Sequence, residues 1–358
     1  MKILYVAAES SNWVINLCNE LAELGNEITC VTQDLDEYDK ENPIPVHNNV
    51  TRVNLPFSTF VDPNKLVVEL DEIMKYNMFD IVFGSHAPVC PAVLVAANKN
   101  KTKCGFMLLD IPTDLMEVQE ARRKQWDFWF KFLTQADLMI TNTHIARDEF
   151  TRLTDIELDD SHVITYGTNM PVEFNLFGKT MKQDYVVSVC RLTPVKNCIL
   201  IPKALNKLKE LDLAYIAVGR DSGQLEEIKK YCEENEIRFE HHNMVSESDK
   251  FKLISNATAL VYPQSTEFIG GLSPFEGMYA GTSVIVPGLK VMLDLYHEHA
   301  TYFENNSADD LARTIKNATK RIDPGKLVNA NEYAKKEASF KTMARKLNIK
   351  MKETVRRK

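Results

Sequence analysis

Residues 262–287, YPQSTEFIGGLSPFEGMYAGTSVIVP, give the clearest indication of the fold class of this chain. The apolar run at 259–262 is typical of a buried parallel strand. A glycine pair follows at 270–271, and residues 274–279 are predicted to form a helix. Because glycines let the backbone approach a ligand closely and a helix N-terminus favours negative charge, this segment predicts an anion site. The run at 283–286 predicts the next strand, which completes a unit of the α/β class, whose sheets bind ligands at the carboxyl ends of their strands.

The same stretch resembles the signature of a known family, the retaining glycosyltransferases with the GT-B fold that form glycosyltransferase family 4. That signature runs Tyr-Pro-Ser, two residues, Glu-Gly-Phe-Gly-Leu, two or three residues, Leu-Glu-Ala-Met-x-x-Gly-x-Pro-Val-Ile. The resemblance implies that Glu267 contacts hydroxyls of the donor sugar and that Glu276 holds the ribose diol. Eight residues separate the two glutamates, whereas the family usually has seven, so Glu267 departs from the family spacing. The alternative is that either carboxylate is a solvated residue.

A second motif lies upstream, at 186–197, VVSVCRLTPVKN. It predicts a strand that runs into a loop, and it resembles the family segment Gly-Arg-Leu-x-x-x-Lys-Gly. The resemblance implies that Arg191 and Lys196 stabilise the diphosphate leaving group, because two fixed cations can do so without a metal. The alternative is a pair of surface charges beside a helix start. Cys190 replaces the usual glycine, and we interpret it as a small buried residue and not as a nucleophile.

The segment between the two motifs predicts a strand at 214–219 and an amphipathic helix at 224–235. The strand ends in Gly219, and Gly223 follows in the turn. This arrangement resembles a glycine-containing turn of the family, and a plain strand-to-helix turn is the alternative.

The segment 239–246 precedes a helix predicted at 247–256 and resembles the family loop that contacts the nucleotide base. This places Met244 and Val245 beside the base. We interpret the two neighbouring histidines, 241–242, as loop residues, because no further ligand lies at metal-binding spacing. Together, the resemblance implies a donor-binding set of Glu276, Gly270, Gly271, Leu272, Ser273, Gly219, Met244 and Val245.

The amino-terminal half alternates strands and helices in the same way. Residues 2–6 and 28–32 are predicted strands, and residues 13–24 form a predicted helix between them. Alternation of this kind predicts a parallel doubly wound sheet, and 358 residues suit two such domains. We therefore expect an α/β protein of GT-B architecture, with two Rossmann-like doubly wound parallel-sheet domains that face a cleft.

The domain boundaries follow from these motifs and from the resemblance. An acceptor-binding domain is expected at 1–168, and a domain that binds the nucleotide-sugar donor is expected at 169–335. The family often returns its last helix to the first domain, so we expect residues 336–358 to do so.

Four residues of the first domain are candidates for the acceptor side. Ser10 and Ser11 follow the first strand, where they offer an N–H pocket for the acceptor or simply cap the next helix. His86 follows another predicted strand and is a candidate for contact with the acceptor. The alternative is that His86 has only a structural role. Asp110 ends the predicted strand 106–110, where it could orient the acceptor hydroxyl or act as a base.

Composition limits the remaining functions. A formal net charge of −7 argues against a protein that coats nucleic acid. No apolar run reaches transmembrane length, the first residues lack a signal-peptide pattern, and seven scattered cysteines suggest reduced thiols. These features favour a cytoplasmic protein.

Two basic regions bear on the acceptor. The lysines of 99–103 are predicted to lie in a loop, and 341–358 is rich in Lys and Arg. A solvated helix is the default for the latter, although lipid or DNA acceptors would also favour such charge. The aromatic residues Trp126, Trp129 and Phe130 are predicted to be core residues.

The predicted activity is transfer of a sugar from a nucleoside diphosphate sugar, with UDP- or GDP-sugars favoured, to a hydroxyl acceptor. The resemblance implies retention of configuration through front-face attack, and neither a metal nor a further cofactor is expected. The acceptor is a glycan, a lipid or, in a bacteriophage enzyme, a hydroxymethylated DNA base. The alternatives are a GT-B sugar-nucleotide epimerase and a non-catalytic protein that binds nucleotide sugars.

Overall fold

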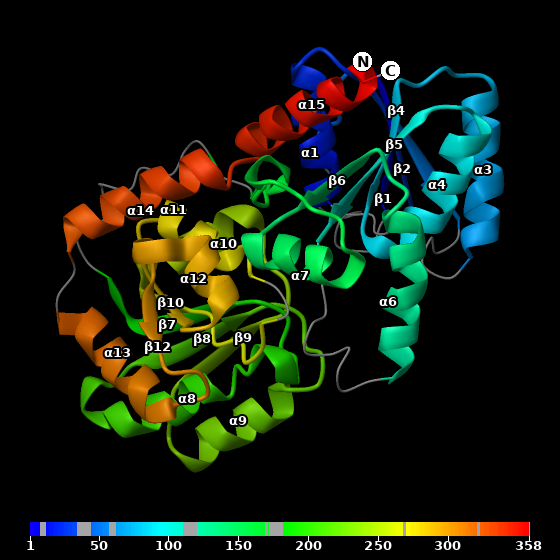
Figure 1. Cartoon of the computed structure of the whole chain (residues 1–358). Coiled ribbons are helices and arrows are strands. Elements are labelled where there is room, and N and C mark those ends of the chain that lie inside the picture. Colours follow the sequence, from blue (N-terminus) through cyan, green and yellow to red (C-terminus); the bar gives the residue numbers. More distant parts are fainter. Residues whose placement is uncertain are drawn as a thin grey trace. The chain divides into compact units, whose positions relative to one another are not determined.

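The computed structural model divides the chain into two compact domains (Figure 1). The first contains Met1–Gly167 and Phe340–Lys358, and the second contains Thr168–Ser339. The structure describes residues 1–7, 12–33, 44–56, 62–109, 120–168, 171, 182–267, 270–320 and 323–357.

The first domain is built on a six-stranded parallel sheet of order β3-β2-β1-β4-β5-β6. Its strands are β1 Lys2–Ala7, β2 Glu27–Gln33, β3 Val50–Leu55, β4 Ile81–Ser85, β5 Lys103–Leu108 and β6 Leu138–Thr141. Its helices are α1 Asn12–Glu23, α3 Pro63–Lys75, α4 Cys90–Lys99, α6 Glu120–Leu133, α7 His144–Thr154 and α15 Phe340–Arg356, with short 3-10 helices η1 Ala87–Val89 and η2 Asp160–His162.

The second domain is built on another six-stranded parallel sheet, of order β12-β11-β10-β7-β8-β9. Its strands are β7 Gln183–Val189, β8 Ala214–Val218, β9 Phe239–His242, β10 Ala257–Val261, β11 Ser283–Pro287 and β12 Thr301–Phe303. Its helices are α8 Leu200–Leu205, α9 Leu225–Glu234, α10 Glu247–Asn256, α11 Ser273–Tyr279, α12 Lys290–Tyr296, α13 Ala308–Lys320 and α14 Pro324–Glu337, with 3-10 helices η3 Pro194–Lys196, η4 Asn206–Leu211 and η5 His297–His299.

Both sheets have the same doubly wound order, because each starts at a central strand, grows to one edge and then returns to grow to the other. The prediction of two Rossmann-like parallel-sheet domains is therefore confirmed. Helices α8, α9 and α13 pack on one face of the second sheet, and α10, α11, α12 and α14 pack on the other (Figure 1).

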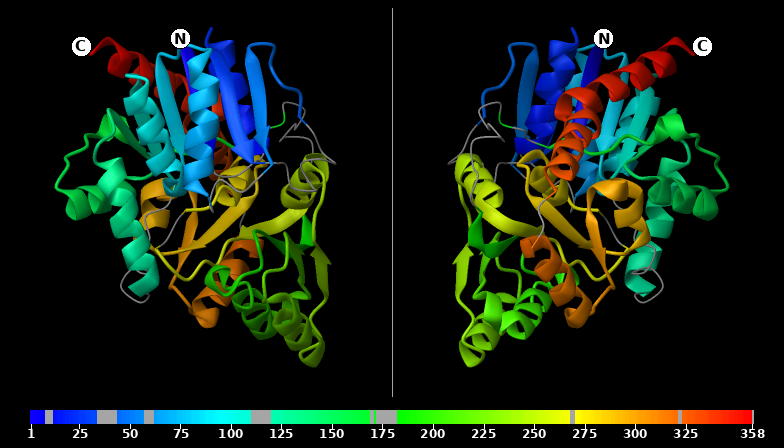
Figure 2. Two further views of the ribbon diagram at one scale, coloured as in Figure 1. Left: turned by 90° about the vertical axis from the view of Figure 1, so that its right-hand side faces the viewer. Right: turned by 90° about the vertical axis from the view of Figure 1, so that its left-hand side faces the viewer.

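In the first domain, α3, α4, α6 and α7 cover one face of the sheet, where Trp126 and Phe130 are buried as predicted. Helices α1 and α15 pack against each other, away from this core cluster (Figure 2). Asn26, in the turn after α1, donates to Asn348 of α15 at 3.0 Å. The ring of Trp13 lies 5.9 Å from that of Phe340, so the carboxyl-terminal helix is an integral part of the first domain.

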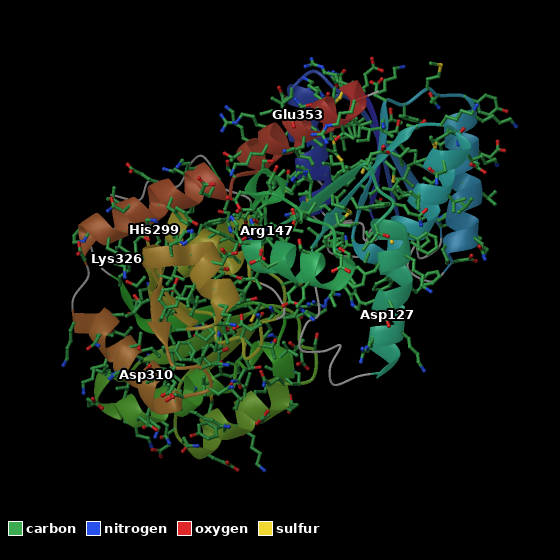
Figure 3. The ribbon with its side chains drawn as sticks, viewed as in Figure 1. Asp127, Arg147, His299, Asp310, Lys326 and Glu353 are labelled. Atoms are coloured by element: carbon green, nitrogen blue, oxygen red, sulfur yellow. The ribbon has the colours of Figure 1, made fainter. Side chains whose placement is uncertain are left out.

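Helix α14 is tied to its own domain through the segment before β12. Lys326 donates to the carbonyl oxygen of Ala300 at 3.4 Å, and the ring of His299 stacks on Tyr333, with 4.2 Å between centroids (Figure 3). Among the described residues, no helix combines the length and the apolar composition needed to cross a membrane.

The structure corrects the predicted loop at 99–103. Lys99 ends helix α4 and Lys103 begins strand β5, so only the turn between them is a loop. Lys99 forms an ion pair with Asp71, and Lys103 forms one with Asp137 at 2.8 Å. Because these carboxylates neutralise Lys99 and Lys103, the two lysines give little support to a basic patch that binds a lipid or DNA acceptor.

Candidate functional site

The strand order of the second sheet reverses between β7 and β10. These strands pair with each other, and the sheet continues from them in opposite directions through β8 and β11. In doubly wound sheets, ligands bind outside the carboxyl ends of the strands at such a switch point. The loop after β7 carries Arg191 and Lys196, and the segment after β10 carries Tyr262 and Gln264. The predicted cations thus follow one of the two strands that define the switch point.

Lys196 is held in a defined position. Its ammonium group donates to the hydroxyl of Tyr262 and, at 2.5 Å, to Oε1 of Gln264. It also lies 4.8 Å from the centre of the Tyr262 ring. Burial raises the pKa of Tyr262 well above its ordinary value, so the phenol stays neutral and donates in turn to Gln264 at 3.2 Å. A cation fixed in this way needs little further ordering when it meets an anion.

Arg191 differs from Lys196 in its surroundings. Its side chain is exposed, and its guanidinium forms no hydrogen bond or ion pair with the residues that the structure describes. One predicted cation is therefore fixed by protein contacts, and the other is available to a ligand.

Glu276 is a buried carboxylate in the first turn of α11, with 6% of its surface exposed. Its Oε1 accepts from the ammonium of Lys250 at 2.9 Å and from the hydroxyl of Thr168 at 3.1 Å. Its Oε2 has no partner among the described residues. The start of α11 adjoins the switch point, because Ser273 donates to the carbonyl oxygen of Val189, the last residue of β7. Glu276 thus presents one fixed and one unoccupied oxygen in this region.

Lys250 of α10 is the counter-ion of Glu276. Burial alone would lower the pKa of Lys250, but the charges of Glu276 and Glu247 outweigh it and raise the pKa above its usual range. Glu247 accepts from the same ammonium group at 2.8 Å. Lys250 therefore stays charged and orients the carboxylate of Glu276.

Glu267 has a structural contact. Its two carboxylate oxygens accept from the backbone N–H groups of Lys290 and Val291, at 2.8 and 2.9 Å. These are the first two residues of α12, so Glu267 caps that helix from a distant loop. Each oxygen keeps a second acceptor position.

Replacing Glu267 by alanine should destabilise the protein by about 0.5–2 kcal/mol, as loss of a helix cap does. Glu267→Gln should cost less, since it keeps one acceptor oxygen. Urea denaturation of both variants measures this. Equal stability of the alanine variant and the unmodified protein would show that the cap does not contribute.

The glycine pair before α11 is packed tightly. A Cβ on Gly270 would lie 1.8 Å from Leu295, and one on Gly271 would lie 2.5 Å from the ring of Tyr262. The N–H of Gly271 donates to the hydroxyl of Tyr296 at 3.0 Å. Leu272 occupies the N-cap position and offers no side-chain acceptor. The glycines therefore bring this backbone against the side chains of Leu295 and Tyr262, and the N–H of Gly271 already has a protein partner.

Gly219 follows β8 with φ of +139°, and its N–H donates to the carbonyl oxygen of His242 at 2.9 Å. Met244 is exposed and Val245 is half-buried in the segment after β9. The interpretation of His241 and His242 as loop residues is wrong, because both lie in strand β9. Elsewhere in the described part of the chain, too, no group of three or more His, Cys, Asp or Glu side chains could hold a metal ion.

In the first domain, His86 follows β4, one of the two strands at that sheet's switch point. Its φ of +72° and ψ of +138° are rarely adopted by a residue other than glycine, and such strain tends to occur at functional sites. Its Nδ1 is buried and has no hydrogen-bond partner among the residues that the structure describes. The other acceptor-side candidates, Ser10, Ser11 and Asp110, lie outside the described residues.

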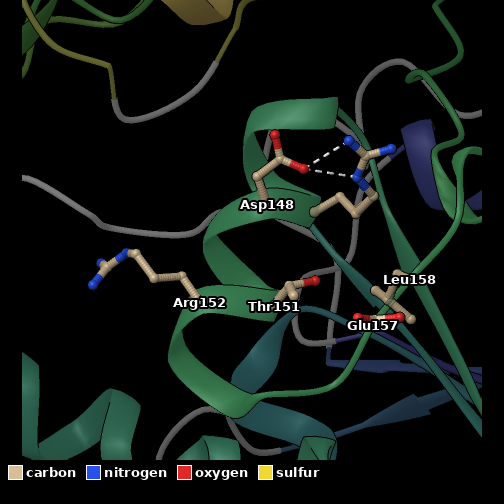
Figure 4. Close-up of a pocket in the computed structure, with 6 residues that line it drawn as sticks. Asp148, Thr151, Arg152, Glu157 and Leu158 are labelled. Atoms are coloured by element: carbon tan, nitrogen blue, oxygen red, sulfur yellow. Dashed lines mark hydrogen bonds and ion pairs between the residues drawn. The ribbon is translucent and has the colours of Figure 1, made fainter.

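A pocket of about 400 Å³ lies elsewhere in the first domain (Figure 4). It is formed by α7 and the segment after it, and is lined by Arg147, Asp148, Thr151, Arg152, Glu157 and Leu158. Both arginines are paired with carboxylates, Arg147 with Asp148 and Asp160 and Arg152 with Glu149. The pocket contains none of the residues predicted to act on a substrate.

Comparison with family models assigns both halves of the chain. Residues 171–337 match the family described as glycosyl transferases group 1, and residues 10–170 match the one described as glycosyltransferase family 4. The chain belongs to glycosyltransferase family 4. It is therefore an enzyme that transfers sugars, as its motifs predicted. A search of curated proteins found no match.

Solved structures of glycosyltransferases share the fold along the whole chain. A glycosyltransferase from Rickettsia africae has a TM-score of 0.77 at 17% identity, with 100% of this chain and 99% of that chain covered. HepE from Anabaena, in complex with UDP and glucose, has a TM-score of 0.76 at 16% identity, with 99% and 100% covered. A sucrose-phosphate synthase from Thermosynechococcus elongatus has a TM-score of 0.78 at 14% identity, with 99% of each chain covered. At these identities the likeness establishes the GT-B fold.

The motifs of this glycosyltransferase did not reveal every residue around its candidate site. Lys250 and Thr168, which hold Glu276, were not predicted, and neither was Gln264, which holds Lys196. Gln264 follows the Tyr-Pro pair of the signature, so its position in the sequence could have identified it as a site residue. Lys250 offered none, since a lysine three residues after Glu247 is typical of an exposed ion pair on a helix.

Proposed function

We propose that this glycosyltransferase moves a sugar from a nucleoside diphosphate sugar, such as a UDP- or GDP-sugar, to a hydroxyl acceptor with retention of configuration. In this reaction the bond between the anomeric carbon and the diphosphate oxygen breaks, and a bond to the acceptor oxygen forms on the same face. The acceptor proton passes to the leaving diphosphate. The main support is the fixed ammonium of Lys196 beside the switch point of the second sheet.

Arg191 and Lys196 are proposed to stabilise the diphosphate as negative charge develops on it. Groups that are already oriented toward the developing charge lower the barrier without reorganisation. Lys196 meets this condition, because Tyr262 and Gln264 hold it in place. The exposed guanidinium of Arg191 can bind two phosphate oxygens at once.

Glu276 is proposed to accept hydrogen bonds from the ribose diol through Oε2, while Lys250 and Thr168 hold Oε1. Glu267 is proposed to contact the donor sugar with the acceptor positions that capping of α12 leaves open. Gly219, Met244 and Val245 are proposed to flank the base. These assignments place donor recognition in the second domain.

The first domain is proposed to bind the acceptor through Ser10, Ser11, His86 and Asp110. His86 has the clearest support, since its strained backbone and unpartnered Nδ1 lie at a switch point. The chemical class of the acceptor, whether glycan, lipid or modified DNA base, is an outcome of acceptor trials with the donor once it is known.

Replacing Lys196 by methionine is expected to lower kcat/KM by roughly 10- to 100-fold, the value of a hydrogen bond to a charged group. The reason is loss of the ammonium that Tyr262 and Gln264 fix beside the switch point. Lys230→Met, on an exposed face of α9, serves as the matched control and should leave turnover unchanged. Equal activity of the two variants would remove Lys196 from the mechanism.

Because two side-chain cations are assigned to the diphosphate, turnover is expected to be unaffected by EDTA. The measurement is the initial rate in protein dialysed against chelator, with and without added Mg²⁺ or Mn²⁺. Strict dependence on added metal would show that Arg191 and Lys196 are insufficient and that the proposal of metal independence is wrong.

The first experiment is a thermal-shift screen against UDP, GDP, ADP and dTDP and their sugar conjugates, because a ligand that binds the folded state raises Tm. Product analysis with the selected donor then separates transfer from epimerisation of the donor. Donor binding without transfer, hydrolysis or epimerisation under all acceptor conditions would contradict the proposal.

A further inference from the structure

Two cysteines flank the loop that carries Arg191 and Lys196. Cys190 follows strand β7, and Cys198 precedes helix α8. Their sulfur atoms lie 3.4 Å apart, within hydrogen-bonding distance for thiols. Both cysteines are free thiols in the structure, so the loop is closed at its base by a contact between two groups that can be oxidised.

The surroundings shift the pKa values of the two thiols in opposite directions, upward for Cys190 and downward for Cys198. The hydrogen bond that the Cys190 thiol donates lowers the pKa of Cys198, whereas burial raises it. The hydroxyls of Tyr215 and Ser188 and the charge of Lys196 lower the pKa further. Cys198 is fully buried, whereas Cys190 is partly exposed. Cys190 is therefore the less buried residue of the pair, and Cys198 lies beside it as a proton acceptor.

The backbone of the pair is anchored on both sides. The N–H of Cys190 donates to the carbonyl oxygen of Val218 at 2.9 Å, and the N–H of Cys198 donates to Oε1 of the buried Gln224 at 2.8 Å. These contacts hold the two sulfur atoms close together even when the loop between them moves. Proximity of this kind makes reaction of one sulfur with the other much faster than with an external thiol.

We propose that Cys190 and Cys198 are a redox modification site, at which a peroxide converts the two thiols into a reversible disulfide that weakens binding of the donor. In contrast to the interpretation from the sequence, in which Cys190 was not a nucleophile, its sulfur attacks one oxygen of hydrogen peroxide and gives its proton to the Cys198 thiolate. An S–O bond forms, the O–O bond breaks, and hydroxide leaves. The Cys198 sulfur then attacks Cys190, and an S–S bond replaces the S–O bond. The departing hydroxide takes the Cys198 proton and leaves as water, so the two sulfurs lose two electrons and the peroxide gains them.

The effect on the donor rests on the proposed function. A disulfide holds its sulfur atoms about 2.05 Å apart, so the present 3.4 Å separation must shrink by more than 1 Å. The side chains of Cys190 and Cys198 must turn toward each other to close this distance, and the disulfide then constrains the loop that carries Lys196, whose contacts with Tyr262 and Gln264 depend on its position. Loss of one hydrogen bond to a charged group should weaken nucleotide binding on the order of tenfold.

The disulfide can be mapped directly in the full chain. Trypsin separates the two cysteines, because it cleaves after Lys182, Arg191, Lys196 and Lys203. After treatment with hydrogen peroxide and alkylation of the remaining thiols, mass spectrometry should find peptides 183–191 and 197–203 joined, and dithiothreitol should release them. Two free thiols, a stable sulfinic acid at Cys190 or a link to another cysteine would overturn the proposal.

Variants separate the pair from the other thiols. In Cys198→Ser the cross-link should be absent, and oxidation of Cys190 to a sulfenic acid, which dimedone traps, should be slower, because the proton acceptor of Cys190 is gone. Cys232→Ser, on α9, is the matched control and should still form the cross-link. If Cys190 in Cys198→Ser reacts with peroxide as fast as Cys190 in the unmodified protein, Cys198 is not the proton acceptor and the attack sequence is wrong.

Nucleotide affinity is then compared between the reduced and the oxidised protein by calorimetry with the nucleotide that the thermal-shift screen selects. Unchanged affinity in protein with the mapped disulfide would overturn the regulatory effect. A reduced protein that binds no nucleotide would instead refute the proposed function, and the peptide map would still decide whether the disulfide forms.

Discussion

Replacing Glu276 by methionine is expected to destabilise the second domain by about 3 kcal/mol, at the lower end of the cost of removing one partner from a buried ion pair. The side chain of Lys250 is 14% exposed, and its ammonium would keep Glu247 as its counter-ion among the described residues. The hydroxyl of Thr168 would lose its acceptor. Methionine preserves the volume, so little of this loss comes from a cavity. Urea denaturation, followed by intrinsic fluorescence, measures the free energy of unfolding.

The matched variants are Lys250→Met and the double variant that carries both changes. Lys250→Met alone leaves a buried carboxylate without its cation and should also destabilise the domain. The double variant should recover much of the stability, because two packed apolar side chains need no desolvation of charge. If the destabilisation of the double variant equals the sum of those of the two single variants, Glu276 and Lys250 do not form a coupled pair.

The double variant also separates structure from function. It is expected to fold but to bind the donor nucleotide with about 1–3 kcal/mol less free energy, since it lacks the carboxylate oxygen assigned to the ribose diol. Calorimetry on the folded double variant tests this directly. Affinity equal to that of the unmodified protein would leave Glu276 with a structural role alone.

Strands and helices of the second domain were predictable because their local sequence is consistent with their burial. The predicted strand at 259–262 corresponds to β10, Ala257–Val261, and the predicted helix at 247–256 coincides with α10. A parallel strand covered by helices on both faces must be apolar throughout, so it is visible in the sequence. The ends of the helices were equally visible, as at Ser246, which caps α10 by accepting from the N–H of Asp249.

Contacts between distant segments were not predictable in the same way. Glu267 caps a helix that begins 23 residues later, and Lys250 pairs with a carboxylate 26 residues away. Neither pair has a periodic signal, because the partners meet only after the sheet has formed. The polar strand β9 was missed for a related reason. It is the edge of its sheet, where side chains are only partly covered and His241 and His242 are tolerated.

Replacing Gly219 by alanine is expected to destabilise the second domain by about 4 kcal/mol, from a strained φ and an overpacked contact that cost about 1–3 kcal/mol each. With φ at +139°, its new Cβ would lie 2.1 Å from the carbonyl oxygen of Cys190. That oxygen belongs to the backbone at the end of β7 and cannot rotate away. To relieve the clash, the segment that leads to Arg191 would have to move, so donor binding should weaken as well.

Gly223→Ala is the matched control for this effect. Gly223 also has a positive φ, +102°, but no atom would lie within 4 Å of the Cβ that alanine adds at that position. It should therefore show only the backbone strain, about 1–2 kcal/mol, with donor affinity unchanged. Free energies of unfolding in urea give both values on one scale. Equal losses of unfolding free energy in Gly219→Ala and Gly223→Ala would mean that the contact between Gly219 and Cys190 relaxes freely. The close approach of β8 to the Arg191 loop would then not explain the glycine at position 219.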